Sequence, residues 1–209
     1  MMLPRRTIVV DGADAPRAAG GRRVWLGEHP LVLSGARPRV GQRLEAEFSV
    51  PPARSTNTPL DSKALTRGIV VLSTLPNIRA NACHVQIAGL EEMLPRYLPK
   101  ARLCHVSSDG VDAWCEVDEY HPDLRACAYT LDGVDSATHD AFRAAFGVGV
   151  ERYTRIAHGL FLLVEGIFRL VHIPRQQLGP ARVSAFLRRA SRIVSALDAE
   201  RSIQPGGAA

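Results

Sequence analysis

The sequence contains no long hydrophobic run. Among its 209 residues, no stretch approaches the roughly 18 consecutive apolar residues that a membrane-spanning helix requires. The apolar run near the N-terminus is limited to Ile8, Val9 and Val10, which is too short for the hydrophobic region of a signal peptide. We therefore expect no membrane partner and, as the default, a cytoplasmic location.

Lysine and clustered positive charge are also scarce. Lys63 and Lys100 are the only lysines, and the arginines are scattered along the chain, so the net charge of +5 is not gathered in one basic tract. Proteins that bind nucleic acid through phosphate contacts usually concentrate such charge on one face. The charge pattern therefore argues against a nucleic-acid partner.

Motifs for metals and cofactors are missing as well. No C-x-x-C or H-x-x-x-H spacing occurs, and His84 follows Cys83 directly, which turns the two side chains about 100° apart on a helix. Gly147 and Gly149 lack the third glycine and the preceding strand of a dinucleotide fingerprint. We predict no metal and no cofactor. We expect reduced thiols at all four cysteines, Cys83, Cys104, Cys115 and Cys127.

What is present is an alternation of strand and helix patterns that predicts an α/β fold with a mixed sheet. Strands are expected at 44–50, 69–73, 101–107 and 126–131, and hairpins at 24–33 and 159–172. Helices are expected from Cys83 onward and at 112–119, 136–146 and 180–197. The segment 61–66 is expected to be helix-like or irregular.

The chain length favours one domain. We place that domain at residues 23–200. A segment rich in Gly, Pro and small residues at 1–22 predicts a flexible extension before it, and residues 201–209 are expected to form a loose tail.

Cys83 is the strongest candidate for chemistry. It follows the predicted buried strand 69–73 and stands at the start of a predicted helix. Unpaired N–H groups in the first turn of a helix stabilise negative charge, and a thiol is a useful nucleophile only as thiolate. A cysteine in this position is also often a small buried hydrophobe, as we expect for Cys104 and Cys127 in their strands.

The segment from Pro76 to Cys83 resembles the thiol peroxidase pattern of Pro, any residue, Ile, two residues ending in Thr, two more residues, and Cys. Other features follow in that family's order: a hairpin, an Arg-Pro-containing turn at 37–41, the strand end at 71–73, the turn at 106–109, and a last hairpin and helix. The resemblance covers about residues 23–197. It implies an atypical two-cysteine peroxiredoxin with a thioredoxin-like fold, a mixed central sheet flanked by helices and an N-terminal β-hairpin.

The resemblance also implies a mechanism. Cys83 would attack a peroxide, form a sulfenic acid and condense with Cys115, whose place on a helix about thirty residues later is that of the family's resolving cysteine. A thioredoxin-type reductant would reset the disulfide, and the protein would be a homodimer. The peroxide site would be lined by the loop and first turn before Cys83, with Pro76, Ala80, Asn81 and Ala82.

Two positions depart from the family pattern. Ala80 stands where the family has Thr, and alanine offers no hydroxyl to the peroxide or the thiolate. His158 stands where the family has Arg, and imidazole carries at most one charge and titrates near neutral pH. Arg155 or Arg79 could supply the missing charge, which adds Arg155 to the candidate catalytic residues Cys83, Cys115 and His158.

The departures leave three hypotheses open. The chain is a peroxidase; or it is a related enzyme that uses Cys83, with His158 as base, on a specialised metabolite; or it is a redox-sensing module without turnover. A deep pocket beside Cys83 would favour the second hypothesis. A thiol pKa close to that of free cysteine would favour the third.

Overall fold

The computed structural model describes residues 22–203, and its core is a mixed sheet of six strands in the order β11-β10-β6-β7-β8-β4. These strands are β4 (Pro52–Arg54), β6 (Ile69–Leu75), β7 (Arg102–Ser107), β8 (Cys127–Thr130), β10 (Gly159–Val164) and β11 (Ile167–His172). Strands β6, β7 and β8 are parallel, whereas β10, β11 and β4 run antiparallel to their neighbours. The predicted α/β fold with a mixed sheet is therefore confirmed.

Shorter strands lie outside this sheet. The hairpin of β1 (Arg22–Leu26) and β2 (His29–Ser34) pairs with β9 (Gly149–Val150). A two-stranded ladder joins β3 (Ser49–Val50) to β5 (Leu60–Asp61), and a 3-10 helix, η1 (Ser62–Thr66), follows β5.

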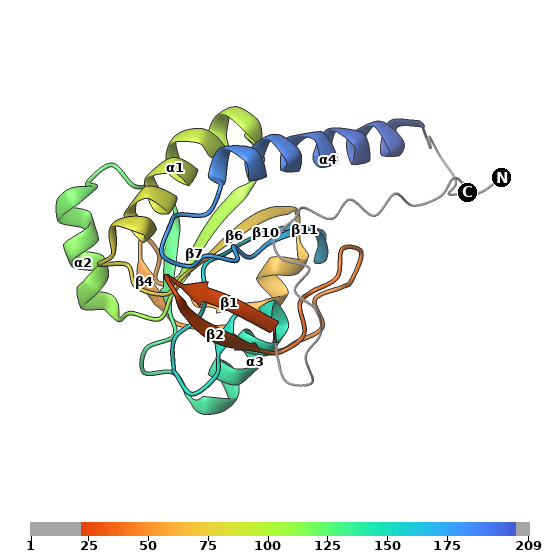
Figure 1. Cartoon of the computed structure of the whole chain (residues 1–209). Coiled ribbons are helices and arrows are strands. Elements are labelled where there is room, and N and C mark those ends of the chain that lie inside the picture. Colours follow the sequence, from red (N-terminus) through yellow and green to blue (C-terminus); the bar gives the residue numbers. More distant parts are fainter. Residues whose placement is uncertain (1–21, 204–209) are drawn as a thin grey trace.

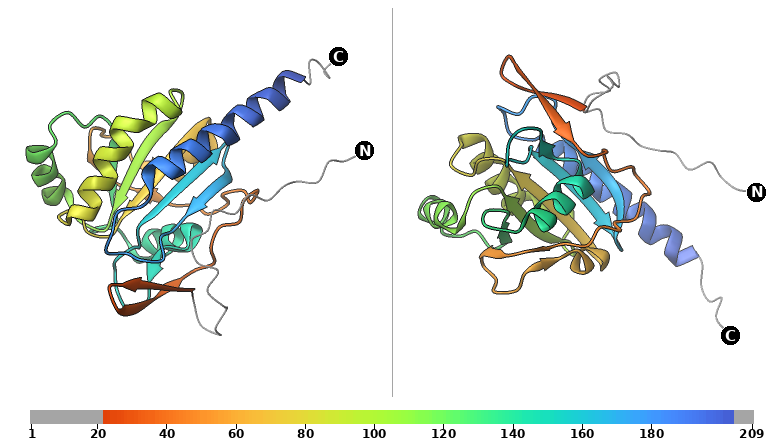
Figure 2. Two further views of the ribbon diagram at one scale, coloured as in Figure 1. Left: turned by 45° about the horizontal axis from the view of Figure 1, so that its top comes forward. Right: turned by 90° about the horizontal axis from the view of Figure 1, so that it is seen from below.

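Helices cover both faces of the sheet (Figures 1 and 2). The first face carries α1 (Asn81–Tyr97) and α4 (Val183–Ile203), which pack together over a core that includes Leu90, Leu160 and Leu187. The opposite face carries α3 (Ser136–Phe146), whose Phe142 and Phe146 enter a second core. The remaining helix, α2 (Val111–Tyr120), lies at one side of the molecule, near the start of α1 (Figure 1). None of the helices within residues 22–203 is long and apolar enough to cross a membrane.

The register of the central strands sets the place of the candidate site. In the antiparallel pair β10–β6, Gly159 lies opposite Thr74, so His158 enters beside the carboxyl end of β6. A Cβ atom on Gly159 would lie 2.9 Å from Thr74 Oγ1, which explains glycine at this close approach. The chain leaves β6 through the loop 76–80 and enters α1, so residues far apart in sequence meet at this sheet edge.

Three expectations about element boundaries are wrong. The last helix was expected at 180–197, but α4 begins at Val183 and continues to Ile203. The alternation in 44–50 predicted a full strand, but only Ser49–Val50 forms a ladder, because the rest of the segment buries Leu44 and Phe48 without running beside a long partner strand. The tail expected from residue 201 is helical up to Ile203, where α4 ends. Residues 1–21 of the predicted extension lie outside the described residues, and Arg22 already belongs to β1.

Candidate active site

Cys83 lies in the first turn of α1, where Ala80 occupies the N-cap position. Alanine has no polar side chain to cap this turn, and the Cys83 N–H donates to the Ala80 carbonyl at 2.9 Å. The Cys83 side chain is completely buried and packs in a cluster with Ile87, Trp114 and Val117. The helix start therefore holds Cys83 in position while α2 shields it from solvent.

Burial dominates the acid–base behaviour of this thiol. It raises the pKa of Cys83 to about 12, mainly by desolvating the thiolate, with a smaller contribution in the same direction from the charge of Asp109. A backbone hydrogen bond from Asn77 and the charge of Arg155 lower the pKa of Cys83, but they do not offset the burial. The resting side chain is therefore a neutral thiol.

His158 is the side chain that meets the thiol. Its Nε2 lies 3.7 Å from Cys83 Sγ, and only 2% of the residue is exposed. Burial lowers the pKa of His158 to about 4, so the imidazole is neutral at physiological pH. Its backbone is held in place, because the His158 N–H donates to Gln177 Oε1 at 2.7 Å and the preceding carbonyl, of Ala157, accepts from Thr74 Oγ1.

Gln86 is a third member of the site that the sequence analysis missed. Its Oε1 lies 3.1 Å from His158 Nδ1, and its Nε2 donates to Ser73 Oγ at 2.8 Å. Gln86 is completely buried, one helical turn after Cys83. A polar residue three positions after Cys83, on the face that also buries Ile87 and Leu90, was the signal in the sequence.

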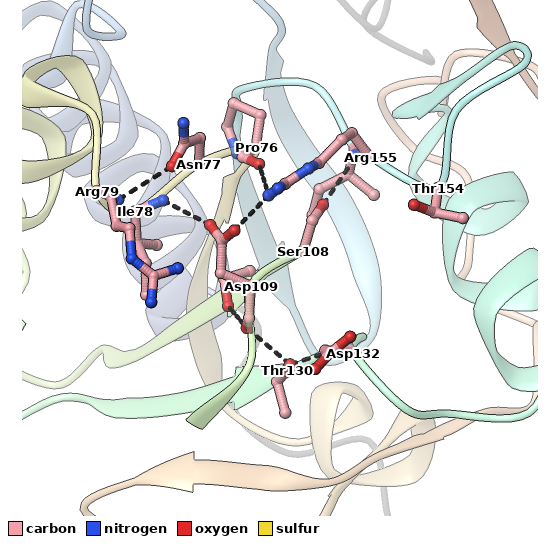
Figure 3. A network of polar contacts seen from close by, with 12 residues as sticks. Pro76, Asn77, Ile78, Arg79, Ser108, Asp109, Thr130, Asp132, Thr154 and Arg155 are labelled. Carbon is pink, nitrogen blue, oxygen red and sulfur yellow. Dashed lines mark hydrogen bonds and ion pairs between the residues drawn. The ribbon is translucent and has the colours of Figure 1, made fainter. Parts of the chain in front are cut away.

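Arg155 does not contact the thiol. Figure 3 shows its guanidinium directed at the Asp109 carboxylate and at the carbonyl of Pro76, 2.8 Å away. Asp109 is itself buried and accepts from the backbone N–H of Ile78 at 2.7 Å. Arg155 and Asp109 therefore clamp the loop that leads into α1 and act on Cys83 only through its charge environment.

This clamp makes a prediction about stability. Asp109→Asn replaces one of the two acceptor oxygens with an NH2 group, which can only donate. That NH2 group would face another donor, either the Arg155 guanidinium or the Ile78 N–H. We expect a loss of roughly 2 kcal/mol in unfolding free energy, because either the buried Ile78 N–H loses its acceptor or the half-exposed Arg155 guanidinium loses its charged partner. Urea unfolding followed by circular dichroism measures it, with Asp123→Asn on the surface as control; equal midpoints for both variants would refute the clamp.

The other predicted residues line or flank the entrance to α1. Asn81 and Ala82 form its first turn together with Cys83, and the Pro76 carbonyl belongs to the clamp. Arg79 forms a bidentate ion pair with Glu116 on α2, at 2.7 and 2.8 Å. Its guanidinium is therefore engaged at the surface and does not contact the Cys83 sulfur.

Cys115 lies on α2 but does not point at Cys83. The inward face of this helix presents Ala113, Trp114 and Val117 to the Cys83 cluster, whereas Cys115 is exposed. Trp114 Nε1 donates to Ser107 Oγ at 3.0 Å, which fixes the covering helix to the end of β7. All four cysteines are free thiols. Because Cys83 is buried and Cys115 is exposed, a bond between them needs a rearrangement of α2.

A pair of histidines joins the ends of the two helices. His121, just after α2, places Nε2 3.1 Å from Nδ1 of His84, the residue after Cys83. Burial, followed by the neighbouring His121, lowers the pKa of His84. Among residues 22–203 there is no group of three or more His, Cys, Asp or Glu side chains that could hold a metal ion.

Comparison with solved structures identifies the scaffold, whereas no family model and no curated protein matches the sequence. Among solved structures, a peroxiredoxin-like protein from Aquifex aeolicus matches with a TM-score of 0.68 and 15% identity over 83% of this chain and 98% of the other. A thiol peroxidase from Chromobacterium violaceum matches with a TM-score of 0.64 and 14% identity over 88% and 99%, respectively. The peroxidoxin BcpB from Mycobacterium tuberculosis matches with a TM-score of 0.58 and 17% identity over 77% of this chain and 99% of the other.

The chain thus has the thioredoxin-like fold of the thiol peroxidases and peroxiredoxins. At these identities the likeness establishes the fold, while activity has to be argued from the site. In that site a neutral thiol, a neutral imidazole and an amide are brought together.

Proposed function

We propose that this protein is a thiol-dependent peroxidase that reduces hydrogen peroxide and small alkyl hydroperoxides at Cys83, with His158 as its proton relay. The observation that carries the proposal is the 3.7 Å contact between Cys83 Sγ and His158 Nε2 at the start of α1 in a peroxiredoxin scaffold. A nucleophile and a base within reach of each other are the minimum for nucleophilic catalysis.

The first step can be written so that protons and electrons balance. His158 Nε2 takes the thiol proton as the sulfur attacks the outer peroxide oxygen, and the O–O bond breaks. The imidazolium then gives the same proton to the departing oxygen, which leaves as water or alcohol. Sulfur is oxidised by two electrons to a sulfenic acid, and the peroxide is reduced by two.

The relay does a task that a fixed positive charge would not do. An arginine stabilises a thiolate that already exists, whereas His158, whose pKa is lowered to about 4, takes the proton of the buried thiol, whose pKa is raised to about 12, only while the S–O bond forms. The relay also returns that proton to the leaving oxygen. With His158 in this place, the Cys83 thiol is not ionised before the peroxide binds; it loses its proton during the reaction itself.

Resetting the enzyme needs two thiols. In our proposal the Cys115 thiol attacks the Cys83 sulfenic acid, and water leaves as the disulfide forms. A dithiol reductant of the thioredoxin type then restores both thiols by exchange. The exposed position of Cys115 supports the second half of this scheme, because the reductant can reach it without entering the core.

The burial of the site supports a small substrate. Cys83 is 0% exposed and His158 is 2% exposed, so only a small molecule gains access through a modest movement of α2. The same Cys83–His158 contact also suits the second hypothesis, an enzyme acting on a specialised metabolite. Such a ligand would need an open pocket beside the sulfur, and the complete burial of Cys83 favours peroxide.

Peptide mapping after a single oxidation tests the proposal. Reduced protein receives one equivalent of hydrogen peroxide, and we expect a Cys83–Cys115 disulfide in the wild type and in Cys127→Ser, the matched control at another free thiol. In Cys115→Ser we expect a sulfenic acid at Cys83 that dimedone traps. Oxidation that begins at Cys115, Cys104 or Cys127 instead would reject Cys83 as the peroxide-reactive residue.

The pH dependence of the first step is a separate prediction. Since the pKa of Cys83 is raised to about 12 and that of His158 is lowered to about 4, the neutral pair persists throughout the range between them. We expect the rate constant for oxidation by hydrogen peroxide to be flat between about pH 6.5 and pH 9. A rise of about tenfold per pH unit would show that free hydroxide, rather than His158, removes the proton.

A further inference from the structure

We propose that Gln86 is a positioning residue that holds His158 in the tautomer with its proton on Nδ1, so that the bare Nε2 lone pair faces Cys83. The claim about the tautomer stands on the hydrogen bonds of this structure, and its consequence for peroxide chemistry rests on the proposed function.

Two backbone groups fix that orientation. The Gln86 amide nitrogen lies 3.4 Å from the carbonyl oxygen of Thr74, which can only accept a hydrogen bond. The amide oxygen lies 3.4 Å from the N–H of Ala181, which can only donate. Reversing the amide would set oxygen against oxygen and N–H against N–H, so the orientation is determined on both sides. Ser73 Oγ, 2.8 Å from the amide nitrogen, accepts its second hydrogen.

The orientation of the amide decides the histidine tautomer. Gln86 presents an oxygen, an acceptor, at 3.1 Å from His158 Nδ1, so Nδ1 must carry the proton. A neutral imidazole has only one N–H, so Nε2 is left as an acceptor, 3.7 Å from Cys83 Sγ. The thiol S–H then points at the lone pair that removes its proton.

The alternative tautomer would disable the relay. With the proton on Nε2, the imidazole would donate to the sulfur instead of accepting the thiol proton, and Nδ1 would turn its lone pair on the Gln86 oxygen. The positions along the chain support the assignment. Gln86 lies one turn after Cys83 on α1, and both side chains contact His158, which immediately precedes β10. Cys83, His158 and Gln86 form a nucleophile, a base and an orienting group in that order.

An amide in the orienting place also has an electrostatic consequence. Gln86 accepts a hydrogen bond but adds no negative charge, so nothing opposes the burial that lowers the pKa of His158 to about 4. A carboxylate there would stabilise the imidazolium. The wild-type pair therefore stays uncharged until a peroxide is present.

Nuclear magnetic resonance of the histidine rings tests the tautomer directly. Long-range proton–nitrogen spectra of the full chain labelled with nitrogen-15 histidine separate a protonated from a bare ring nitrogen, and His158→Leu assigns the signal. We expect Nδ1–H and a bare Nε2 for His158 in the wild type. A signal with Nε2–H would overturn the proposal, whatever the activity of the protein.

Two substitutions extend the test. Gln86→Leu removes the acceptor, and we expect His158 to lose its single tautomer and the oxidation rate of Cys83 to fall at least about tenfold. Gln86→Glu keeps an acceptor and adds charge, and we expect the pKa of His158, read by the same spectra, to rise by about one to three units while Nδ1 stays protonated. If both variants fold and leave tautomer, pKa and rate unchanged, Gln86 is not a positioning residue.

The outcomes separate this proposal from the proposed function. An Nδ1–H tautomer in a protein whose Cys83 ignores peroxide would leave the assignment of Gln86 intact and reject the peroxidase. A reactive Cys83 beside a histidine with Nε2–H would keep the peroxidase but reject both the assignment of Gln86 and the role of His158 as proton relay.

Discussion

Replacing His158 by leucine is expected to slow the oxidation of Cys83 by hydrogen peroxide by roughly a hundredfold to ten thousandfold, the usual contribution of a positioned acid–base group. The physical reason is that the Cys83 thiol, whose pKa is raised to about 12 by burial, then has no nearby acceptor for its proton. The leaving oxygen also loses its proton donor. Stopped-flow mixing with excess peroxide measures the effect.

The control for this prediction is a histidine elsewhere in the fold. His29→Leu changes an exposed residue on β2 and should leave the rate unchanged. Near-ultraviolet circular dichroism checks that the side chains around Trp114 remain packed in the His158→Leu protein. A folded His158→Leu protein that reacts as fast as the wild type would show that the imidazole is only a buried neighbour of the sulfur.

Acid destabilisation is the second large effect we expect. Three buried histidines, His105, His158 and His172, have pKa values lowered by burial to about 3, 4 and 4. Both ring nitrogens of His105 and of His172 have no hydrogen-bond partner within residues 22–203. Folding therefore keeps all three rings neutral, while the unfolded chain protonates them near pH 6.5.

The sign and size of this effect follow from linkage. Between about pH 6.5 and pH 4 the unfolded state binds more protons than the folded state, so stability is full above pH 6.5 and falls as the pH drops toward the folded values. At pH 5 each ring costs about 2 kcal/mol relative to neutral pH, and the three together cost about 6 kcal/mol. A loss of that size is comparable to the whole stability of many domains.

Urea unfolding at pH 7.5 and at pH 5.0 measures this loss. The variant His105→Leu should lose about one third less stability between the two pH values, since it removes one titrating ring and its two unpartnered nitrogens. His29→Gln, at an exposed position, should behave as the wild type. Equal unfolding free energies at both pH values would contradict the assignment of three neutral buried rings.

Local patterns in the sequence predicted most of the fold. The helix Ser136–Phe146 was predicted with its observed limits from its pattern and from the stop at Gly147, which adopts a left-handed conformation; in the structure Asp135 also caps the first turn. The buried run at 69–73 predicted the central strand β6, which extends to Leu75. Residues 44–50 alternate in burial, but only Ser49 and Val50 have a partner strand, and pairing is a property of the tertiary structure that the local pattern does not specify.

The site could be predicted only in part for a similar reason. The position of Cys83 at the start of a helix is local and follows from strand, loop and apolar spacing. The contact of Gln86 with His158 depends on the register of β10 against β6, which no local pattern specifies. The sequence left open whether Arg155, Arg79 or His158 contacts Cys83, because whether Arg155 reaches the sulfur or Asp109 depends on where the turn after β7 places a buried carboxylate.

The measurement that tests the central claim most directly is the fluorescence of Trp114 after rapid mixing with hydrogen peroxide. Trp114 packs in the same cluster as Cys83, and Trp25→Phe removes the only other tryptophan. Our account predicts a fluorescence change that is first order in peroxide, is absent in Cys83→Ser, and is slowed by at least about a hundredfold in His158→Leu. A signal of wild-type rate in Cys83→Ser, or no reaction of the wild type at millimolar peroxide, would contradict it.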